Sequence, residues 1–545
     1  MIKKGGKQMT EKRIKGGRKT PGAYMEDELI VKGSVKDAIP RGFKLVPPSP
    51  LPASWDHETD VIVVGAGGAG LSAAVTAREK GVQVAVLEKN SGCGGDTSTA
   101  MAFMSRTRNT QFQRRLGIEP IPLSDAFPMA TAGFSNKNNG EVERILIARD
   151  PETADWLEAM GVVYEAGPVA GAPPGMFLMP VNPEHPQDGY YSWFPYNAKG
   201  FIRVLEKRAL ALGVKIFPNT PAASLVIRDG KVIGVTARTK EGQDLSIKGK
   251  VTILAAGGFG ANRAMVKKYA LPHVFTGMAR YVGLPSSMGD GIRIAQGAGA
   301  VLEGMDDIEM WDGGVPGVGE GPMAFYNAAT QLVRQKSLTV NKLGQRFMDE
   351  NSMYGHGHEI GPFSANAAQT LRQKDHTSFT VHDSETVKRE TIIHTFEALA
   401  CKYPCRWYER DFEKRVKDGT IMKADNIKDL ARLMEVDPGS LQKTVDQYNK
   451  YCDEGEDPEF FKPSKYLVPL RKPPFYAVKQ IGAACFNTWG GLVTNQRFQV
   501  LDKEWSPIPG LRVAGQNAAY CASVVYAFTS GRIAGETAAK EALEK

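Results

Sequence analysis

Three glycines near the start of the organised sequence have the spacing of a nucleotide-binding turn. Gly65, Gly67 and Gly70 directly follow the apolar run 60–64 and open an Ala-rich segment that continues to about residue 80. In such a strand–turn–helix unit, the first glycine permits a tight turn, the second lets backbone approach a pyrophosphate, and the third allows helix and strand to pack closely. The helix N-terminus then offers free N–H groups to the phosphates. The sequence therefore predicts a dinucleotide site.

A carboxylate lies where the ribose of such a dinucleotide would be. A second predicted strand, residues 82–87, ends in Glu88, which is 23 residues after Gly65. An acid at this place bonds ribose hydroxyls and disfavours a 2′-phosphate. A second glycine run at 94–98 (GGDTS) has small and hydroxyl side chains that would let backbone approach a longer cofactor. With the late segment GLRVAGQ at 510–516, these features favour FAD over NAD.

The elements that must position these groups point to more than one domain. A chain of 545 residues exceeds the size of a single core, and its 42% hydrophobic and 23% charged residues exclude a disordered, collagenous or disulfide-stapled protein. Up to about residue 260, short apolar runs alternate with amphipathic helical patterns, which is typical of an α/β unit with a largely parallel sheet. Longer charged helical stretches and irregular Gly-rich segments from about 286 to 465 indicate a second domain.

The basic character of the chain is confined to its first residues. Residues 1–19 hold eight Lys or Arg and one Glu, or +7 of the net +8. This leader has no apolar signal stretch and no twin-arginine pair, and no later segment has the apolar length of a membrane span. We therefore expect a cytoplasmic protein with no transmembrane segment and no nucleic-acid partner, although weak contact of the leader with nucleic acid or anionic lipid is an alternative. The six scattered cysteines predict no metal site.

Taken together, these motifs resemble those of the fumarate reductase / 3-ketosteroid dehydrogenase superfamily of FAD flavoproteins. The resemblance covers about residues 58–300, 330–350 and 470–540, and includes VTILAAGGFG (251–260), GDGIRIAQGAGA (289–300), LTVNKLGQRFMDE (338–350) and TWGGLVTN (488–495). It implies an α/β fold, in which a discontinuous Rossmann-like FAD-binding domain carries an inserted α+β capping (substrate) domain. The expected division is a Pro-rich basic leader at 1–56, FAD-binding parts at 57–285 and 466–545, and the cap at 286–465.

The resemblance also implies how the cofactor is held. In the family the closing strand usually ends in an acid, whereas this chain has Gln516, which can hydrogen-bond but adds no charge. The segment around Ser523 falls where a helix N-terminus would face the flavin and stabilise its reduced form. The expected FAD contacts are Gly65, Gly67, Gly68, Ala69, Gly70, Glu88, Lys89, Gly94, Gly95, Asp96, Thr97, Ser98, Ala223, Ala256, Gly257, Asp290, Gln516, Ser523, Val524 and Val525.

Departures from the family's motifs bear on the substrate. Fumarate reductases use an Arg proton donor four residues after the acid of GxRFxxE, but here Tyr354 stands four residues after Glu350. Asn487 replaces their carboxylate-binding His before TxGG, and residues 517–530 hold no counterpart of a third cation. Two buried substrate carboxylates would then lack partners, which argues against fumarate.

Three tyrosines are candidates for the chemistry. Tyr354 matches a ketosteroid dehydrogenase pattern in which a Tyr moves the proton beside the hydride-transfer carbon. Tyr526, followed by Ala527, resembles a Tyr-Ala pair that hydrogen-bonds the substrate ketone, and Tyr520 competes for that role. A phenol can donate to an oxyanion and relay a proton. Packing of Tyr526 within the last helix is an equal alternative.

The resemblance implies hydride exchange between flavin N5 and a carbon–carbon bond next to an electron-withdrawing group. The favoured substrate is an apolar ketone or enone, steroid or bile-acid-like, with reduction favoured over dehydrogenation and an external electron donor or acceptor. One alternative is reduction of another unsaturated aromatic or monocarboxylic acid, with Arg280 or Arg334 as its anchor. Another is an FAD-binding subunit that passes electrons within a complex.

Overall fold

The computed structural model describes most of the chain outside the leader. The described residues are 44–100, 103–133, 137–167, 175, 177–181, 198–281, 283–314, 336–350, 365–387, 412–413 and 415–544. Predictions that concern Tyr354, Arg334 or the first 43 residues lie outside this part, as does the side chain of Arg280.

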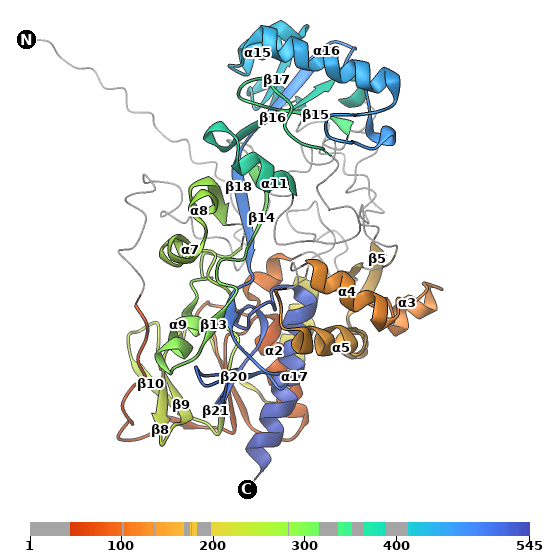
Figure 1. Ribbon diagram of the computed structural model, residues 1–545. Coiled ribbons are helices and arrows are strands. Elements are labelled where there is room, and N and C mark those ends of the chain that lie inside the picture. The colour runs from red at the N-terminus through yellow and green to blue at the C-terminus, as the bar shows by residue number, and fades with distance from the viewer. Residues whose placement is uncertain are drawn as a thin grey trace, which may run out of the picture.

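A six-stranded, mostly parallel sheet forms the centre of the lower part of the molecule (Figure 1). Its order is β20 (Gln499–Leu501), β21 (Pro507–Val513), β11 (Val251–Leu254), β2 (Val61–Val64), β3 (Val84–Leu87) and β7 (Lys215–Phe217). Only the β20–β21 pair is antiparallel. β2, β3 and β11 are buried throughout, which accounts for their composition of Val, Ile and Leu with one Ala and one Thr. Because β21 pairs with β11, the C-terminal part completes a sheet begun at residue 61. The predicted discontinuous α/β fold is confirmed.

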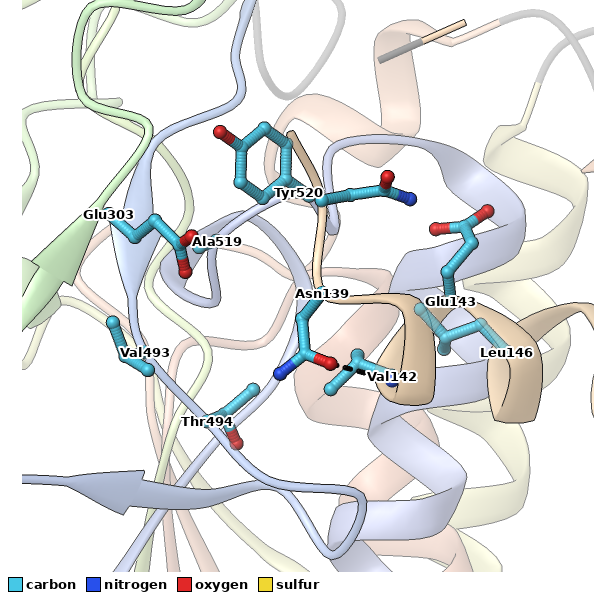
Figure 2. A pocket seen from close by; sticks show the side chains of 10 residues that line it. Asn139, Val142, Glu143, Leu146, Glu303, Val493, Thr494, Ala519 and Tyr520 are labelled. Carbon is cyan, nitrogen blue, oxygen red and sulfur yellow. Dashed lines mark hydrogen bonds between the residues drawn. The ribbon is translucent and has the colours of Figure 1, made fainter. Parts of the chain in front are cut away.

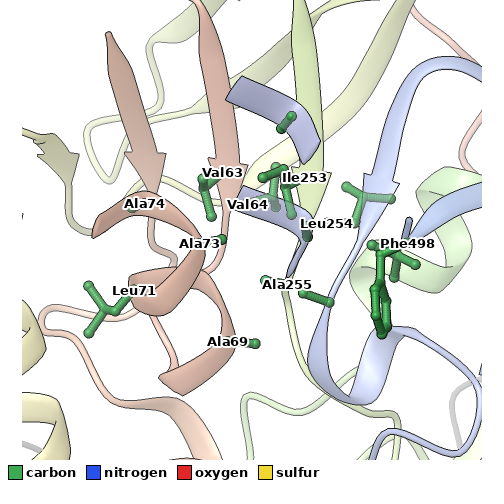
Figure 3. Close-up of a cluster of buried hydrophobic side chains, with 14 of the residues drawn as sticks. Val63, Val64, Ala69, Leu71, Ala73, Ala74, Ile253, Leu254, Ala255 and Phe498 are labelled. Carbon is green, nitrogen blue, oxygen red and sulfur yellow. The ribbon is translucent and has the colours of Figure 1, made fainter. Parts of the chain in front are cut away.

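Two helices beside this sheet pack against each other at close range. α2 (Gly68–Glu79) follows β2, and α17 (Val524–Leu543) is the last helix. A Cβ on Gly531 would lie 2.2 Å from the carbonyl oxygen of Ala69, and one on Gly535 would lie 2.4 Å from that of Ala73. Figure 3 draws part of the core beneath them. The C-terminal helix is therefore held directly against the nucleotide-binding helix.

Smaller sheets and helices surround this core. One sheet has the order β1 (His57–Glu58), β10 (Asp244–Lys248), β9 (Lys231–Arg238) and β8 (Ala222–Arg228), and another the order β4 (Phe103–Met104), β6 (Phe177–Val181) and β5 (Val163–Gly167). β13 (Leu302–Glu303) pairs with β19 (Gly491–Leu492). The helices are α3 (Gln111–Arg115), α4 (Leu123–Gly133), α5 (Gly140–Ala159), α6 (Lys199–Ala211) and α9 (Asp290–Gly297).

One long strand, β18 (Phe475–Thr488), connects the lower part with the upper part (Figure 1). At its lower end it pairs with β12 (Met278–Tyr281) and β14 (Ile308–Gly314), near α7 (Arg263–Tyr269), α8 (Pro272–Gly277) and α11 (Ala365–Leu371). At its upper end it pairs with β16 (Thr377–Asp383) and β17 (Ile421–Ala424), and β15 (Leu338–Asn341) pairs with β16.

A separate hydrophobic core lies in the upper part. It joins β15, β16 and the upper end of β18 to α15 (Ile427–Leu433) and α16 (Pro438–Glu454). This second core supports the proposal of a cap, although the boundaries at 286 and 465 stay predictions. α9, just inside the proposed cap, places Ile294 and Ala295 in the core of the central sheet. None of the helices in the described part of the chain is both long and apolar enough to cross a membrane.

Candidate active site

The glycine turn after β2 leaves one position open. Gly65 has φ +104°, and a Cβ there would lie 2.4 Å from the carbonyl oxygen of Ala255. A Cβ on Gly70 would lie 1.8 Å from the carbonyl oxygen of Gly65. A Cβ on Gly67 would lie 3.6 Å from the carbonyl oxygen of Gly94, which is ordinary van der Waals contact, so protein atoms do not block this position. No side chain caps α2 at Gly67 and no acid lies in its first turn, which suits a pyrophosphate.

Glu88 is fixed at the end of β3 by the same turn. Its two carboxylate oxygens accept hydrogen bonds from the N–H groups of Ala66 (2.8 Å) and Asn90 (2.7 Å). Burial raises the pKa of Glu88, although these N–H groups and Lys89 oppose the rise. The carboxylate thus stands next to the phosphate turn, as a ribose contact requires.

The second glycine run lies beside the first. Gly94 pairs with Gly67 as an isolated bridge, and its N–H donates to the carbonyl of Ala66 (2.9 Å). Thr97 Oγ1 accepts from the N–H of Gly68 (3.2 Å). Gly94 and Gly95 both have positive φ, at 141° and 52°. Two runs with small side chains are therefore joined, and they offer backbone to an extended cofactor.

Three residues that were predicted to contact the cofactor form hydrogen bonds or an ion pair with other protein residues in this structure. Asp96 accepts hydrogen bonds from Tyr281 O–H (2.7 Å), Leu284 N–H (2.6 Å) and Ser287 O–H (2.5 Å), so it anchors the loop after β12. Lys89 and Asp290 form an ion pair of 2.6 Å that connects the end of β3 with the start of α9. Their contacts with FAD stay predictions.

The turn after β21 is bound to the turn after β11 by two amide side chains. Asn517 is fully buried, accepts from the N–H of Ala256 (2.6 Å) and donates to the carbonyl of Gly257 (2.7 Å). Gln516 accepts from the N–H of Gly258 (3.2 Å). Sequence reasoning missed Asn517; its only signal was a second amide directly after the predicted contact Gln516. These bonds hold the backbone that is proposed to contact FAD.

The remaining predicted FAD contacts lie at element ends. Ser523 is the N-cap of α17, and its Oγ accepts from the N–H of Tyr526 (3.3 Å). Val524 and Val525 form the first turn of that helix, which has no acidic residue there. Ala223 is an exposed residue near the start of β8. The uncapped start of α2, the unblocked position at Gly67 and the buried Glu88 fit an FAD, which supplies hydride exchange at flavin N5 when it is bound.

Tyr526 points its hydroxyl into the protein. It is fully buried, and its O–H donates to Glu143 of α5, which is buried as well. The guanidinium carbon of Arg106 lies 5.7 Å from the centre of its ring. Burial raises the pKa of both Tyr526 and Glu143. These contacts favour the packing interpretation over a bond to a substrate ketone.

Tyr520 lies at a small pocket between α5 and β13 (Figure 2). Glu143 and Glu303 are among its other lining residues. The O–H of Tyr520 donates to Asp307 (3.0 Å), which also accepts from Lys137 (2.7 Å). Burial, followed by the charge of Asp307, raises the pKa of Tyr520. The phenol is thus joined to an acid and a partly exposed base, which is a usable arrangement for passing a proton.

The acid that precedes Tyr354 belongs to a buried ionic cluster. Glu350 is fully buried and accepts from the N–H of Thr339 (2.9 Å), from Arg346 (2.9 Å) and from Lys462, whose Nζ lies 3.2 Å away. Asp457 is a second partner of Arg346, at 2.8 Å. Tyr354 itself lies outside the described residues. The cluster fixes the backbone four residues before it.

Asn487, which replaces the expected His, contacts a protein carboxylate. Its Nδ2 donates to Oε2 of Glu309 (2.6 Å), and the two residues lie opposite each other on β18 and β14. Next to it, Thr488 Oγ1 accepts from the N–H of Phe259 (3.2 Å). Asn487 is therefore bonded to an acid, and its neighbour Thr488 is bonded to the turn that follows β11.

One positively charged side chain near the lower end of β18 was not anticipated from the sequence. Arg263, the first residue of α7, stacks over Phe275 with 4.7 Å between its guanidinium carbon and the ring centre. Burial lowers its pKa. Within the described ranges, no acidic side chain lies within ion-pair distance of Arg263. A guanidinium in this setting could hold an anionic group.

Comparison with known proteins identifies the family and its cofactor. The FAD binding domain family matches residues 60–531. A vinyl phenol reductase of Lactiplantibacillus plantarum is 29% identical over 88% of this chain and 96% of its own length, and a urocanate reductase of Eggerthella lenta is 30% identical over 94% and 80%. An NADH:acrylate oxidoreductase of Vibrio harveyi is 27% identical over 89% of this chain, which spans only 51% of that protein.

Solved structures share the fold. A flavocytochrome c3 fumarate reductase in its open conformation has a TM-score of 0.69 at 24% identity, covering 90% of this chain and 80% of that one. A 3-ketosteroid-Δ4-(5α)-dehydrogenase of Rhodococcus jostii has a TM-score of 0.70 at 24% identity, covering 92% and 100%.

The chain belongs to the FAD binding domain family, within the fumarate reductase / 3-ketosteroid dehydrogenase superfamily. It is an FAD-dependent oxidoreductase that acts on carbon–carbon bonds. The sequence-based predictions of the superfamily, the cofactor and the enzyme class are confirmed.

Proposed function

We propose that this protein reduces the α,β double bond of an uncharged, largely apolar ketone or enone, with electrons from an external donor. Steroid-like and bile-acid-like ketones belong to this class. A neutral aromatic alkene lacks the carbonyl but, like them, has no carboxylate beside the double bond. The vinyl phenol reductase, by its name, acts on a compound that has no carboxylate.

The contact between Asn487 and Glu309 is the observation that carries this proposal. The donor group of Asn487 is bonded to a protein carboxylate at 2.6 Å. A substrate carboxylate brought to the same place would face Glu309, and like charges at short range in a site of low dielectric repel strongly. An uncharged substrate has no such cost.

The chain's own residues then have distinct proposed roles. Tyr354 would give the proton to the carbon beside the one that takes the hydride. Tyr520 is preferred over Tyr526 for polarising a carbonyl because it lines a pocket, whereas Tyr526 is fully buried against Glu143. In this role the Tyr520 O–H would turn from Asp307 to the carbonyl. The first turn of α17 would stabilise negative charge on the reduced cofactor.

Reoxidation of the reduced holoenzyme tests the proposal. The purified protein is reduced with dithionite without oxygen and mixed with single alkenes: a 3-keto-4-ene steroid, 4-vinylphenol, acrylate, urocanate and fumarate. Return of the oxidised flavin absorbance is expected with a neutral alkene and not with fumarate. Reoxidation by the carboxylates alone would refute the proposed substrate class.

A second candidate is the reductase of an unsaturated monocarboxylate. Arg263 favours it, since no described acid pairs with this half-buried guanidinium; Arg280 and Arg334 remain the anchors proposed from the sequence. The names of the acrylate and urocanate relatives point the same way. Under this alternative, Arg263→Met raises the KM for a carboxylate about tenfold or more and leaves a neutral alkene unaffected.

A further inference from the structure

A chain of polar groups leads from the proposed FAD turn to β14. The N–H of Gly258 donates to Oε1 of Gln516 (3.2 Å), and Nε2 of Gln516 donates to Oδ1 of Asn487 (2.6 Å). Nδ2 of Asn487 donates to Oε2 of Glu309 (2.6 Å). We call these four groups the amide chain. It connects η6 (Gly515–Asn517) with β18 and β14, segments far apart in sequence.

The two ends of the amide chain fix its direction. A backbone N–H can only donate, and a carboxylate can only accept. A side-chain amide offers one acceptor and one donor group, so each amide between these ends has a single orientation that satisfies every bond. Glu309 is only 2% exposed. Burial of the Cys485 thiol raises its pKa, and the charge of Glu309 is the second cause of that rise. The negative end of the chain is therefore a buried carboxylate on β14.

We propose that Glu309 is a positioning residue of the flavin site, which carries the negative charge of the amide chain and thereby requires an uncharged Gln at position 516. A glutamate at 516 would place a second carboxylate against Oδ1 of Asn487. The amide of Asn487 would then lie between two carboxylates, and whichever of them its Oδ1 faced would repel it. Leaving a buried polar group without its partner weakens a site more than removing both partners.

If Glu and Gln are exchanged between positions 309 and 516, the hydrogen bonds of Asn487 can form in the opposite direction. This charge swap therefore tests the proposal. With glutamine at position 309 and glutamate at position 516, the amide of Asn487 can turn over, donate to the carboxylate at position 516 and accept from the amide at position 309. Gly258 N–H still finds an acceptor. The swap also moves the negative charge from position 309 to position 516, which is nearer to the backbone proposed to contact FAD. A nearer anion disfavours electron uptake by the flavin.

Four proteins are compared: the natural chain, Gln516→Glu, Glu309→Gln and the double variant. FAD affinity is measured by fluorescence during titration of the apoprotein, and the midpoint potential of bound flavin by dye equilibration. We expect Gln516→Glu to weaken FAD binding about tenfold or more, and the double variant to recover to within about threefold of the natural chain. The potential should be highest in Glu309→Gln, intermediate in the natural chain and lowest in the double variant.

A matched control separates this effect from a general effect of charge. Gln243→Glu makes the same change at an exposed position and should alter neither readout. Unchanged FAD affinity in Gln516→Glu, or a double variant at least as weak as the single one, overturns the proposal. If Gln516→Glu does not fold, recovery of folding in the double variant supports the amide chain, and failure to recover overturns it. A natural chain that binds no FAD would instead refute the cofactor.

Discussion

Around the glycine turns of the central sheet, the polar contacts bring backbone groups together with each other or with single side chains, whereas the upper core buries four charged side chains that pair with one another. The N–H of Gly65 donates to the carbonyl of Leu87 (2.7 Å), and the N–H of Gly94 to that of Ala66 (2.9 Å). In the upper core, Arg346, Glu350, Asp457 and Lys462 are paired with one another out of contact with water.

This difference determines how each region can fail. Backbone contacts depend on space, so a single added methyl group can block a turn. Buried ions depend on their partners, because a charge left alone in the interior costs several kcal/mol. A cofactor site built from backbone also leaves N–H groups that can bind phosphates. In the ionic cluster, by contrast, the charged groups are already paired with one another. The following changes test this contrast.

The largest loss of stability is expected from Lys462→Met. Nζ of Lys462 donates to the carbonyl of Ser337 (2.7 Å) and to Tyr448 O–H (3.0 Å), and it pairs with Glu350 (3.2 Å). Its removal leaves an acid buried beside one cation too few, so we expect the free energy of unfolding to fall by about 3–5 kcal/mol in urea titrations. The exposed Lys465→Met is the control, with a change within about 0.5 kcal/mol. Equal stability of the two variants would contradict a role for the cluster.

Gly70→Ala should damage the central sheet through space alone. The new Cβ would lie 1.8 Å from the carbonyl oxygen of Gly65, and backbone cannot move away cheaply. We expect a loss of about 1–3 kcal/mol or more in thermal or urea unfolding, together with loss of bound flavin. Gly92→Ala, where no atom lies within 4 Å, should leave both properties unchanged.

Acidification should affect the two regions in opposite directions. Burial lowers the pKa of His382 on β16 to about 3, below its unfolded value of about 6.5. The unfolded chain then takes up a proton that the folded chain refuses, so stability falls by about 2 kcal/mol from pH 7 to pH 5. His382→Gln should abolish this contribution, measured as the slope of unfolding free energy against pH.

Asp150 of α5 provides the opposite case. Burial raises its pKa to about 7, so the folded protein takes up a proton first and this contribution to stability grows as the pH falls below 7. Asp150→Asn should therefore make the unfolding free energy fall more steeply as the pH decreases. His382→Gln should make it fall less steeply. Slopes that change in the same direction for both variants would refute the assignment.

The smallest expected effect on folding is that of Gly67→Ala. Its φ of −76° suits alanine, and the nearest atom to a new Cβ is 3.6 Å away. The unfolding free energy should stay within about 0.5 kcal/mol of the natural value. FAD affinity should fall about tenfold or more, since the methyl group occupies the space a pyrophosphate would need. Unchanged FAD affinity would mean that the phosphates do not approach Gly67.

Much of the cofactor region could be predicted because its signals are local. Glycine spacing, an apolar strand and an acid at the next strand end lie within 30 residues, and each has a steric or electrostatic reason. Family, cofactor and fold were accordingly predicted correctly. The roles of Asp96, Asn517 and Arg263 could not be read in this way, because each depends on a partner or a space supplied by another segment.

The sequence by itself determined the fold of the first glycine turn and, through it, the prediction of a dinucleotide site, since only glycine tolerates the dihedral angle at Gly65 and the close contact at Gly70. Only the tertiary structure decided which side chains form hydrogen bonds and ion pairs with one another. Glu309 meets Asn487 because β14 pairs with β18, and Lys462 meets Glu350 because the chain returns after α16. Tyr526 faces Glu143 because α17 packs against α5. Such pairings follow from strand register and helix packing over long separations, which residue types and spacing do not encode.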